Sequence, residues 1–260
     1  MSSHPIGFFD SGIGGITLWK EITNLLPNEN TIYISDSKNC PYGEKSNEEI
    51  NDISYKNTQF LVDKNCKMII VACNTATTNS ISMLRNKFKV PFIGIEPAIK
   101  PAALNSKTKK IGVLATKGTL TSNLFIETSS DYKHDVKLIN TYGEGLIELI
   151  ENGDSEKELN NLLKKYLKPM IKSNIDQLVL GCTHYPLIKK SIKNIVGESV
   201  NIVDCNHAVA LHAKNILELN NLLNESTMNR LNHTFFNSGK DESAIRKILE
   251  NKYEIFKFEL

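Results

Sequence analysis

The stretch Met68-Ile69-Ile70-Val71-Ala72-Cys73-Asn74-Thr75 decides the fold class of this 260-residue chain. Its first five residues are all apolar, which predicts a strand buried on both faces, as in a parallel sheet covered by helices. The polar residues that follow predict that the chain leaves the strand and begins a helix. Cys73 is therefore expected at the carboxyl end of a strand, where open parallel sheets bind their ligands.

A second stretch, Leu180-Gly181-Cys182-Thr183-His184, repeats this pattern in the other half of the chain. Again a cysteine ends an apolar run, and polar residues follow it. A lone cysteine in such a position is often only a small buried apolar residue, but two in matched positions favour a shared function. Two thiols that face one substrate from opposite sides can remove and return a proton without a cofactor.

Strands and helices alternate along the sequence, which predicts an α/β fold with mainly parallel sheets. The order is also doubled, because the strand expected at 31–35 and the Cys73 segment are echoed by residues 136–140 and the Cys182 segment. We therefore predict two similar lobes rather than one large sheet. The expected strands are 6–9, 31–35, 68–72, 92–95, 110–115, 136–140, 177–181 and 200–203, and the clearest helices are 47–64, 155–172 and 208–223.

The chain is expected to cross between the lobes twice. Pro97 favours an extended residue before it and can open a helix, which places the first crossing near Glu96 and Pro97. A return near Asn206 would bring the C-terminal helices and a strand-like segment at 234–237 back to the first lobe. The predicted lobes are residues 1–97 together with 207–260, and residues 98–206.

The composition excludes several classes of protein. A formal net charge of +2 gives no reason to expect a nucleic acid or an anionic membrane as partner, and no apolar run approaches the ~20 residues of a membrane-spanning helix. Five cysteines without CxxC spacing predict free thiols rather than disulfides or a zinc site. No other metal site is expected, because His207 and His212 do not have the spacing that aligns two ligands on a helix. The chain shows no signal peptide, so a reducing cytoplasm is the expected location.

Other polar residues are expected near the ends of neighbouring strands. Asp10 lies in the segment Asp10-Ser11-Gly12-Ile13-Gly14-Gly15. It could have a functional role, in which it orients a substrate ammonium or assists a thiol. The alternative is a structural role as the cap of the following helix. Cys40-Pro41-Tyr42-Gly43 is either a structural turn or a loop that presents a ring and backbone amides to a ligand. Thr116-Lys117-Gly118-Thr119 is the corresponding turn of the second lobe and offers hydroxyls to an anion. His184, beside Cys182, is suited to proton exchange near neutral pH.

Four motifs together resemble the glutamate racemases of the aspartate/glutamate racemase superfamily. They are Asp10-Ser11-Gly12-x-Gly14-Gly15, Pro41-Tyr42-Gly43, Ala72-Cys73-Asn74-Thr75-Ala76 and Gly181-Cys182-Thr183-His184-Tyr185-Pro186, in the family's order over essentially the whole chain. The resemblance implies two doubly wound α/β lobes related by pseudo-twofold symmetry, with the active site in the cleft between them. It also implies interconversion of L- and D-glutamate without a cofactor or metal, which supplies D-glutamate for peptidoglycan and cell shape.

The resemblance further implies the roles of individual residues. Cys73 would take the α-proton from D-glutamate and Cys182 would take it from L-glutamate, assisted by Asp10 and His184 respectively. Glu151 matches an auxiliary acid, and the nearby Glu148 is the alternative for this role. The implied substrate-binding residues are Asp10, Ser11, Pro41, Tyr42, Gly43, Asn74, Thr75, Thr116, Thr119, Thr183 and His184.

Three other functions fit parts of the pattern. Aspartate is a rival substrate for a racemase of this superfamily. Decarboxylation or isomerisation of a related acid is a second possibility, but it usually accompanies loss of one cysteine, and both are present here. A non-catalytic binding or regulatory protein is the third. Dimers are common in the family, so the expected partners are a second copy of the chain and the small-molecule substrate, with no nucleic acid and no membrane.

Overall fold

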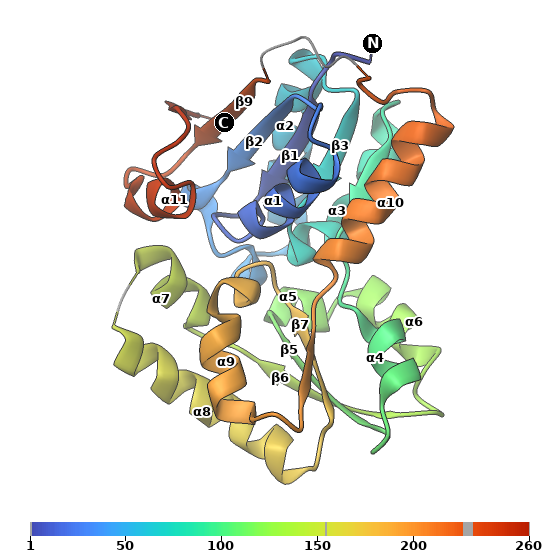
Figure 1. The fold of residues 1–260 in the computed structure, drawn as a ribbon, viewed down its shortest axis with the longest axis vertical. Coiled ribbons are helices and arrows are strands. Elements are labelled where there is room, and N and C mark those ends of the chain that lie inside the picture. Colours follow the sequence, from blue (N-terminus) through green and yellow to red (C-terminus); the bar gives the residue numbers. More distant parts are fainter. Residues whose placement is uncertain (1, 154, 226–230, 260) are drawn as a thin grey trace.

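The computed structural model describes residues 2–153, 155–225 and 231–259. Its strands form two parallel sheets, one in each of the two lobes that lie one above the other in Figure 1. The strands are β1 (Ile6–Asp10), β2 (Thr31–Ser35), β3 (Met68–Val71), β4 (Phe92–Gly94), β5 (Lys110–Ala115), β6 (Lys137–Tyr142), β7 (Gln177–Gly181), β8 (Asn201–Val203), β9 (His233–Asn237) and β10 (Ile255–Lys257).

Helices connect these strands and cover the sheets. The α-helices are α1 (Ile16–Leu25), α2 (Asn47–Asp63), α3 (Asn74–Lys87), α4 (Ile99–Asn105), α5 (Lys117–Leu120), α6 (Asn123–Ser130), α7 (Leu146–Asn152), α8 (Glu156–Lys172), α9 (Lys189–Val196), α10 (Asn206–Leu219) and α11 (Ser243–Ile248). Short 3₁₀ helices are η1 (Ser37–Asn39), η2 (Tyr42–Glu44) and η3 (Tyr185–Ile188).

The two sheets share one strand order. Over the described residues, the upper sheet runs β10-β9-β2-β1-β3-β4 and the lower sheet runs β6-β5-β7-β8. In both, the first strand of the lobe lies between the second and the third, and the fourth follows the third. The prediction of an α/β fold with two similar lobes is therefore confirmed.

Strand β1 shows how the sheet of the first lobe becomes buried on both sides. Successive side chains of a strand point to opposite faces, so Phe8 packs in the core that contains α1 and α10, whereas Phe9 packs in the core that contains α2 and α3. Both phenylalanines are fully buried. The apolar run of β3 is buried in the same way, which explains why it lacks alternating polar residues.

Edge strands depart from their expected limits. β6 ends at Tyr142, two residues beyond the predicted end at 140, and none of its residues is fully buried. Its partner β5 pairs with it from Lys110 to Ala115, and this register carries the strand through Thr141 and Tyr142. Because β6 lies at an edge and is only partly covered, its apolar pattern is weaker than that of a central strand.

The C-terminal part of the chain returns to the first lobe. β9 pairs in parallel with β2, and α10 packs against α1. A buried ion pair lies in the same region, with Nζ of Lys67 2.5 Å from Oε2 of Glu29. Lys67 also donates a hydrogen bond to the carbonyl oxygen of Leu222 at 2.8 Å, so the pair joins the start of β3 to the segment after α10. The residue limits of the lobes, 97/98 and 206/207, remain a prediction.

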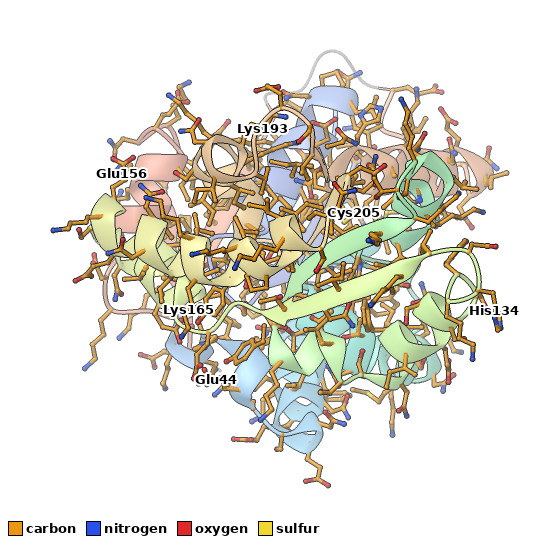
Figure 2. All side chains as sticks on the ribbon, turned by 90° about the horizontal axis from the view of Figure 1, so that it is seen from below. Glu44, His134, Glu156, Lys165, Lys193 and Cys205 are labelled. Atoms are coloured by element: carbon orange, nitrogen blue, oxygen red, sulfur yellow. The ribbon has the colours of Figure 1, made fainter. Side chains whose placement is uncertain are left out.

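Charged side chains are spread over the outside of the molecule. Figure 2 looks at the second lobe from below and shows the exposed Glu156 on one side and the exposed His134 on the other. Within the described residues, none of the helices combines the length and the apolar character that crossing a bilayer requires.

Candidate active site

The two predicted thiols lie at equivalent places in the two lobes. β3 leads to Cys73, the N-cap of α3, whose Sγ accepts a hydrogen bond from the backbone N–H of Ala76 at 3.5 Å. β7 leads in the same way to Cys182, and both thiols are almost completely buried. Burial raises the pKa of Cys73, and negative charge on Asp10 and on Cys182 raises it further. The two thiols are therefore close enough to influence each other across the lobes.

Asp10 lies where the two lobes meet. It ends β1, and its Oδ2 accepts a hydrogen bond from the backbone N–H of Gly15 at 2.8 Å at the start of α1. The hydroxyl of Thr183, from the second lobe, donates to Oδ1 of Asp10 at 3.3 Å. Burial raises the pKa of Asp10 to about 6, although the charge of His184 acts in the opposite direction. At neutral pH Asp10 is mainly a carboxylate, and its charge keeps the proton on Cys73.

His184 connects Cys182 with a carboxylate. Its Nδ1 lies 3.7 Å from Sγ of Cys182, and its Nε2 lies 2.6 Å from Oε1 of Glu151. Burial alone would lower the pKa of His184, but hydrogen bonds with Cys182, Cys40 and Glu151 together raise that pKa well above its ordinary value. The ring is therefore an imidazolium at neutral pH, and it places a positive charge beside Cys182.

The surroundings of the two thiols thus differ in charge. Cys73 has the Asp10 carboxylate nearby and the Ser11 hydroxyl at 3.8 Å from its Sγ. Cys182 has the His184 imidazolium. A negative neighbour favours a neutral thiol, and a positive neighbour favours a thiolate. The two sulfurs therefore lie beside groups of opposite charge.

Glu151 is the acidic residue that contacts His184. It lies on α7 in the second lobe, and its Oε1 also accepts a hydrogen bond from the backbone N–H of Ile13 in the first lobe at 2.8 Å. Glycine at position 12 leaves room for the Glu151 carboxylate, because it has no side chain. A Cβ at this position would lie only 1.9 Å from that same oxygen. Glu148, the alternative acid, lies one turn earlier on α7 and lines a cavity beside the site.

The turn at Cys40-Pro41-Tyr42-Gly43 extends from the first lobe to the second. A Cβ on Gly43 would lie 2.8 Å from Cβ of Thr116, so the backbone of the turn approaches the second lobe closely. Inside the first lobe, Tyr42 donates a hydrogen bond to Asp36 at 2.6 Å and accepts one from the amide of Asn57 at 3.1 Å. These buried contacts hold the turn in position.

Replacing Tyr42 by phenylalanine is expected to lower the free energy of unfolding by about 1–3 kcal/mol, because Asp36 and Asn57 each lose a buried hydrogen-bond partner. Denaturation by urea, followed by circular dichroism, measures this change. The matched control is Tyr55→Phe, at a side chain that is 40% exposed, which should change stability by less than about 0.5 kcal/mol. Equal stability of the two variants would contradict the structural role of the Tyr42 hydroxyl.

Three threonine hydroxyls meet across the lobe boundary. The Thr75 and Thr116 hydroxyls lie 2.9 Å apart, and Thr116 donates to Thr119 at 2.9 Å. Thr75 is at the start of α3, whereas the other two lie at the start of α5. Asn74 uses its amide within the first lobe, where it donates to the carbonyl oxygen of Ile95 at 3.2 Å. Together these residues form a polar group that can donate hydrogen bonds to a carboxylate.

The predicted site residues therefore come together where the lobes meet, and most of them are buried. Sequence reasoning missed two neighbours. Asp36 anchors Tyr42, and its position directly after a strand was the available signal. Cys40 places its Sγ within 4.8 Å of a ring nitrogen of His184, which no sequence spacing could indicate because the two residues lie in different lobes.

Comparisons with known proteins agree with this geometry. The model of the "Asp/Glu/Hydantoin racemase" family matches residues 17–213. A glutamate racemase of Clostridium perfringens is 42% identical over 257 residues, which cover 97% of this chain and 98% of that protein. The crystal structure of glutamate racemase isoform RacE1 from Bacillus anthracis superposes with a TM-score of 0.87 at 33% identity, covering 100% of this chain and 98% of that one. The glutamate racemase of Francisella tularensis, solved in complex with D-glutamate, superposes with a TM-score of 0.86 at 30% identity over 100% and 98% of the two chains.

Proposed function

The chain belongs to the Asp/Glu/hydantoin racemase family, and we propose that it interconverts L-glutamate and D-glutamate with two thiols, Cys73 and Cys182, and no cofactor. The observation that carries this proposal is the pair of buried thiols at equivalent strand ends, one beside a carboxylate and the other beside an imidazolium. The relatives described above support glutamate as the substrate.

Proton transfer in this scheme begins at the thiolate. For L-glutamate, Cys182 takes the α-proton and becomes a thiol, and the electron pair of the C–H bond is left on the substrate as a carbanion stabilised by its carboxylate. The thiol of Cys73 then gives its proton to the opposite face, which produces D-glutamate and leaves Cys73 as a thiolate. For D-glutamate the same steps run in reverse. His184 compensates the charge on Cys182, and Asp10 modulates the basicity of Cys73.

Polar groups of both lobes would hold the substrate. The hydroxyls of Thr75, Thr116 and Thr119 suit a carboxylate, and the carboxylate of Asp10 suits the ammonium group. Because water is largely excluded, these groups act on the developing charge more strongly than they would in solvent. The thiols are almost completely buried in this structure, so substrate entry requires the lobes to separate and close again.

The biological setting completes the proposal. D-glutamate is a building block that the family supplies for peptidoglycan, so the enzyme would act in the cytoplasm in cell-wall synthesis. We also expect it to work as a homodimer, as is common in the family. Support for these points comes from family membership.

An assay with two substrates tests the proposed activity. Purified protein is incubated with L-glutamate and, separately, with L-aspartate, without any added cofactor, and the products are resolved by chiral chromatography. Formation of D-glutamate well above D-aspartate is the expected result. Preferential turnover of aspartate would replace the proposed substrate, and no turnover of either amino acid would favour a non-catalytic role.

Replacing Glu151 by glutamine is expected to slow proton transfer at Cys182 by about tenfold, because the His184 imidazolium loses its negative partner. The measurement is exchange of the α-proton in deuterated water, which should slow for L-glutamate and change much less for D-glutamate. Glu148→Gln is the matched control on the same helix, and we expect a smaller effect. A larger effect of the Glu148 variant would assign the auxiliary role to that residue instead.

A further inference from the structure

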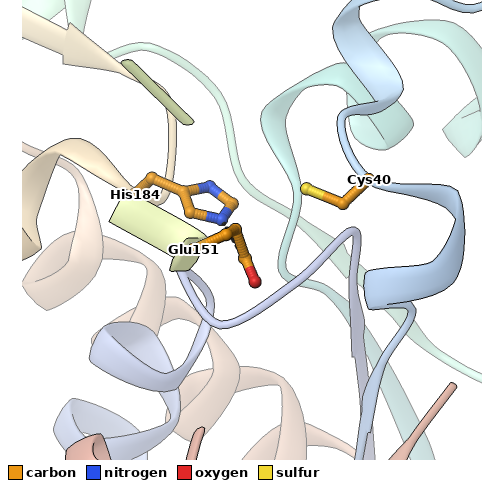
Figure 3. A group of neighbouring side chains, drawn as sticks. All are labelled: Cys40, Glu151 and His184. Atoms are coloured by element: carbon orange, nitrogen blue, oxygen red, sulfur yellow. Dashed lines mark hydrogen bonds and ion pairs between the residues drawn. The ribbon is translucent and has the colours of Figure 1, made fainter. Parts of the chain in front are cut away.

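Three side chains with the chemistry of metal ligands meet beside the active site. Sγ of Cys40, a carboxylate oxygen of Glu151 and a ring nitrogen of His184 all lie within 4.8 Å of one another. Figure 3 shows the Cys40 thiol pointing toward the His184 ring and the Glu151 carboxylate from the opposite side. Within residues 2–153, 155–225 and 231–259, this is the group of three such ligands that the structure contains.

The three ligands come from both lobes. Cys40 follows η1 in the first lobe, whereas Glu151 lies on α7 and His184 follows β7 in the second lobe. Nε2 of His184 and Oε1 of Glu151 are already 2.6 Å apart, so two of the ligands are positioned together before any ion arrives. The thiol of Cys40 faces this pair from the other lobe, with its Sγ within 4.8 Å of both ligand atoms.

Two of the three ligands face a cavity of about 240 Å³, and the third, His184, is buried behind them. Both Cys40 and Glu151 line this cavity, together with Glu148 and Asp241, whose carboxylates add negative charge, and Lys240, whose ammonium group opposes it. A space of this size admits a hydrated ion and leaves room for a bound water. The excess of carboxylates favours a cation over an anion.

We propose that Cys40, Glu151 and His184 form a Zn²⁺ site that joins the two lobes and inhibits the enzyme. Zn²⁺ prefers thiolate, imidazole and carboxylate ligands in a tetrahedral arrangement, and three protein ligands leave a fourth position for water. Zn–S and Zn–N bonds of about 2.3 and 2.0 Å are within reach after small movements of the three side chains.

Binding changes the protonation of two ligands. The Cys40 thiol and Nε2 of His184 each release a proton to solvent as they bind the ion, and Glu151 binds as a carboxylate. Nδ1 of His184 keeps its proton and still faces Cys182. The ring of His184 is then held by the ion at Nε2 and is no longer free to move with the second lobe alone.

The ion would also restrain the lobes. Bonds from Cys40 on one side and from Glu151 and His184 on the other would cross the boundary that must open for substrate to enter. This consequence rests on the proposed racemase function, whereas the binding of the ion does not. Zn²⁺ would therefore lower turnover by keeping the lobes from opening.

The test measures binding and activity separately on the full-length protein. Isothermal titration with Zn²⁺, and absorption spectra with Co²⁺ as a probe of thiolate ligation, are recorded for wild type, Cys40→Ser and Cys205→Ser. We expect one Zn²⁺ per wild-type chain and a thiolate-to-Co²⁺ band. Cys40→Ser should weaken binding by at least about tenfold and remove the band, whereas Cys205→Ser, at a buried cysteine that is the N-cap of α10 and not one of the three ligands, should retain both. Circular dichroism is used to check that each variant is folded. If Cys40→Ser does not fold, Cys40→Ala is measured in its place.

Racemase activity is then compared with and without Zn²⁺, each variant against its own rate in EDTA. Inhibition of wild type that EDTA reverses, together with resistance of Cys40→Ser, is the expected result. Equal Zn²⁺ binding by wild type and Cys40→Ser, or no binding by wild type, would overturn the site. If the ion binds as expected but the protein has no racemase activity in EDTA, the site stands and the proposed function fails.

Discussion

Replacing either Cys73 or Cys182 by alanine is expected to lower kcat/KM for glutamate racemisation by about 10³-fold or more, in both directions. Each inversion needs one sulfur to remove the α-proton and the other to protonate the opposite face. Loss of one thiol therefore blocks both directions, since the forward and reverse reactions pass through the same steps. The unequal charges around the two sulfurs do not alter this requirement.

Isotope exchange separates the roles of the two thiols. In deuterated water, Cys73→Ala should still exchange the α-proton of L-glutamate through Cys182, but should lose most exchange from D-glutamate. Cys182→Ala should show the opposite selectivity. Proton NMR of the α-position follows both reactions, and Cys205→Ala controls for the loss of a buried thiol elsewhere. Full racemase activity in either active-site variant would be incompatible with two-base catalysis.

Gly14→Ala is expected to lower kcat/KM by about 10²-fold, because a methyl group at this position prevents the lobes from closing fully. A Cβ on Gly14 would lie 2.6 Å from the backbone nitrogen of His184 and 2.6 Å from the carbonyl carbon of Thr183. These are backbone atoms of the second lobe, which cannot rotate away as a flexible side chain can. The lobes must move apart, and displacement of reacting groups by about 1 Å is enough for a loss of this size.

A matched glycine distinguishes closure from general damage. Gly197 ends α9 with a φ of +76°, and nothing lies within 4 Å of the position that a Cβ would occupy. Gly197→Ala should cost about 1–3 kcal/mol of stability because its backbone conformation is one that glycine alone adopts readily, but it should retain kcat/KM. Thermal unfolding and initial rates are compared for both variants. If Gly14→Ala is as active as Gly197→Ala, the contact at Gly14 does not control closure.

Most of the fold could be predicted because the decisive segments are locally unambiguous. The run from Met68 to Val71 is apolar throughout and becomes a fully buried central strand. The doubled order of strands also led to two similar lobes, which the common strand order confirms. The limits of β6 were harder to predict, because an edge strand with partly exposed residues lacks a strong apolar pattern.

The parts of the candidate site that lie at the end of a single strand could be predicted from the sequence. Cys73 and Cys182 follow buried strands in their own lobes, so their positions depend on local sequence alone. Contacts between lobes are different, because they depend on how two separately folded surfaces meet. That Glu151, and not Glu148, contacts His184 depends on how α7 lies against that residue. The position of Cys40 near His184 likewise depends on how the two lobes meet.

The pairing of β9 with β2 has a consequence for how the protein is made. The second sheet comes from one continuous segment, whereas the first sheet waits for the end of the chain to be translated. At ~5–20 residues per second, the roughly 200 residues between these partners take about 10–40 s to emerge from a ribosome. During that interval the outer edge of β2 has no partner and is open to pairing with other nascent chains. Premature termination before residue 233 would make that exposure permanent, so truncated products should depend on chaperones or aggregate.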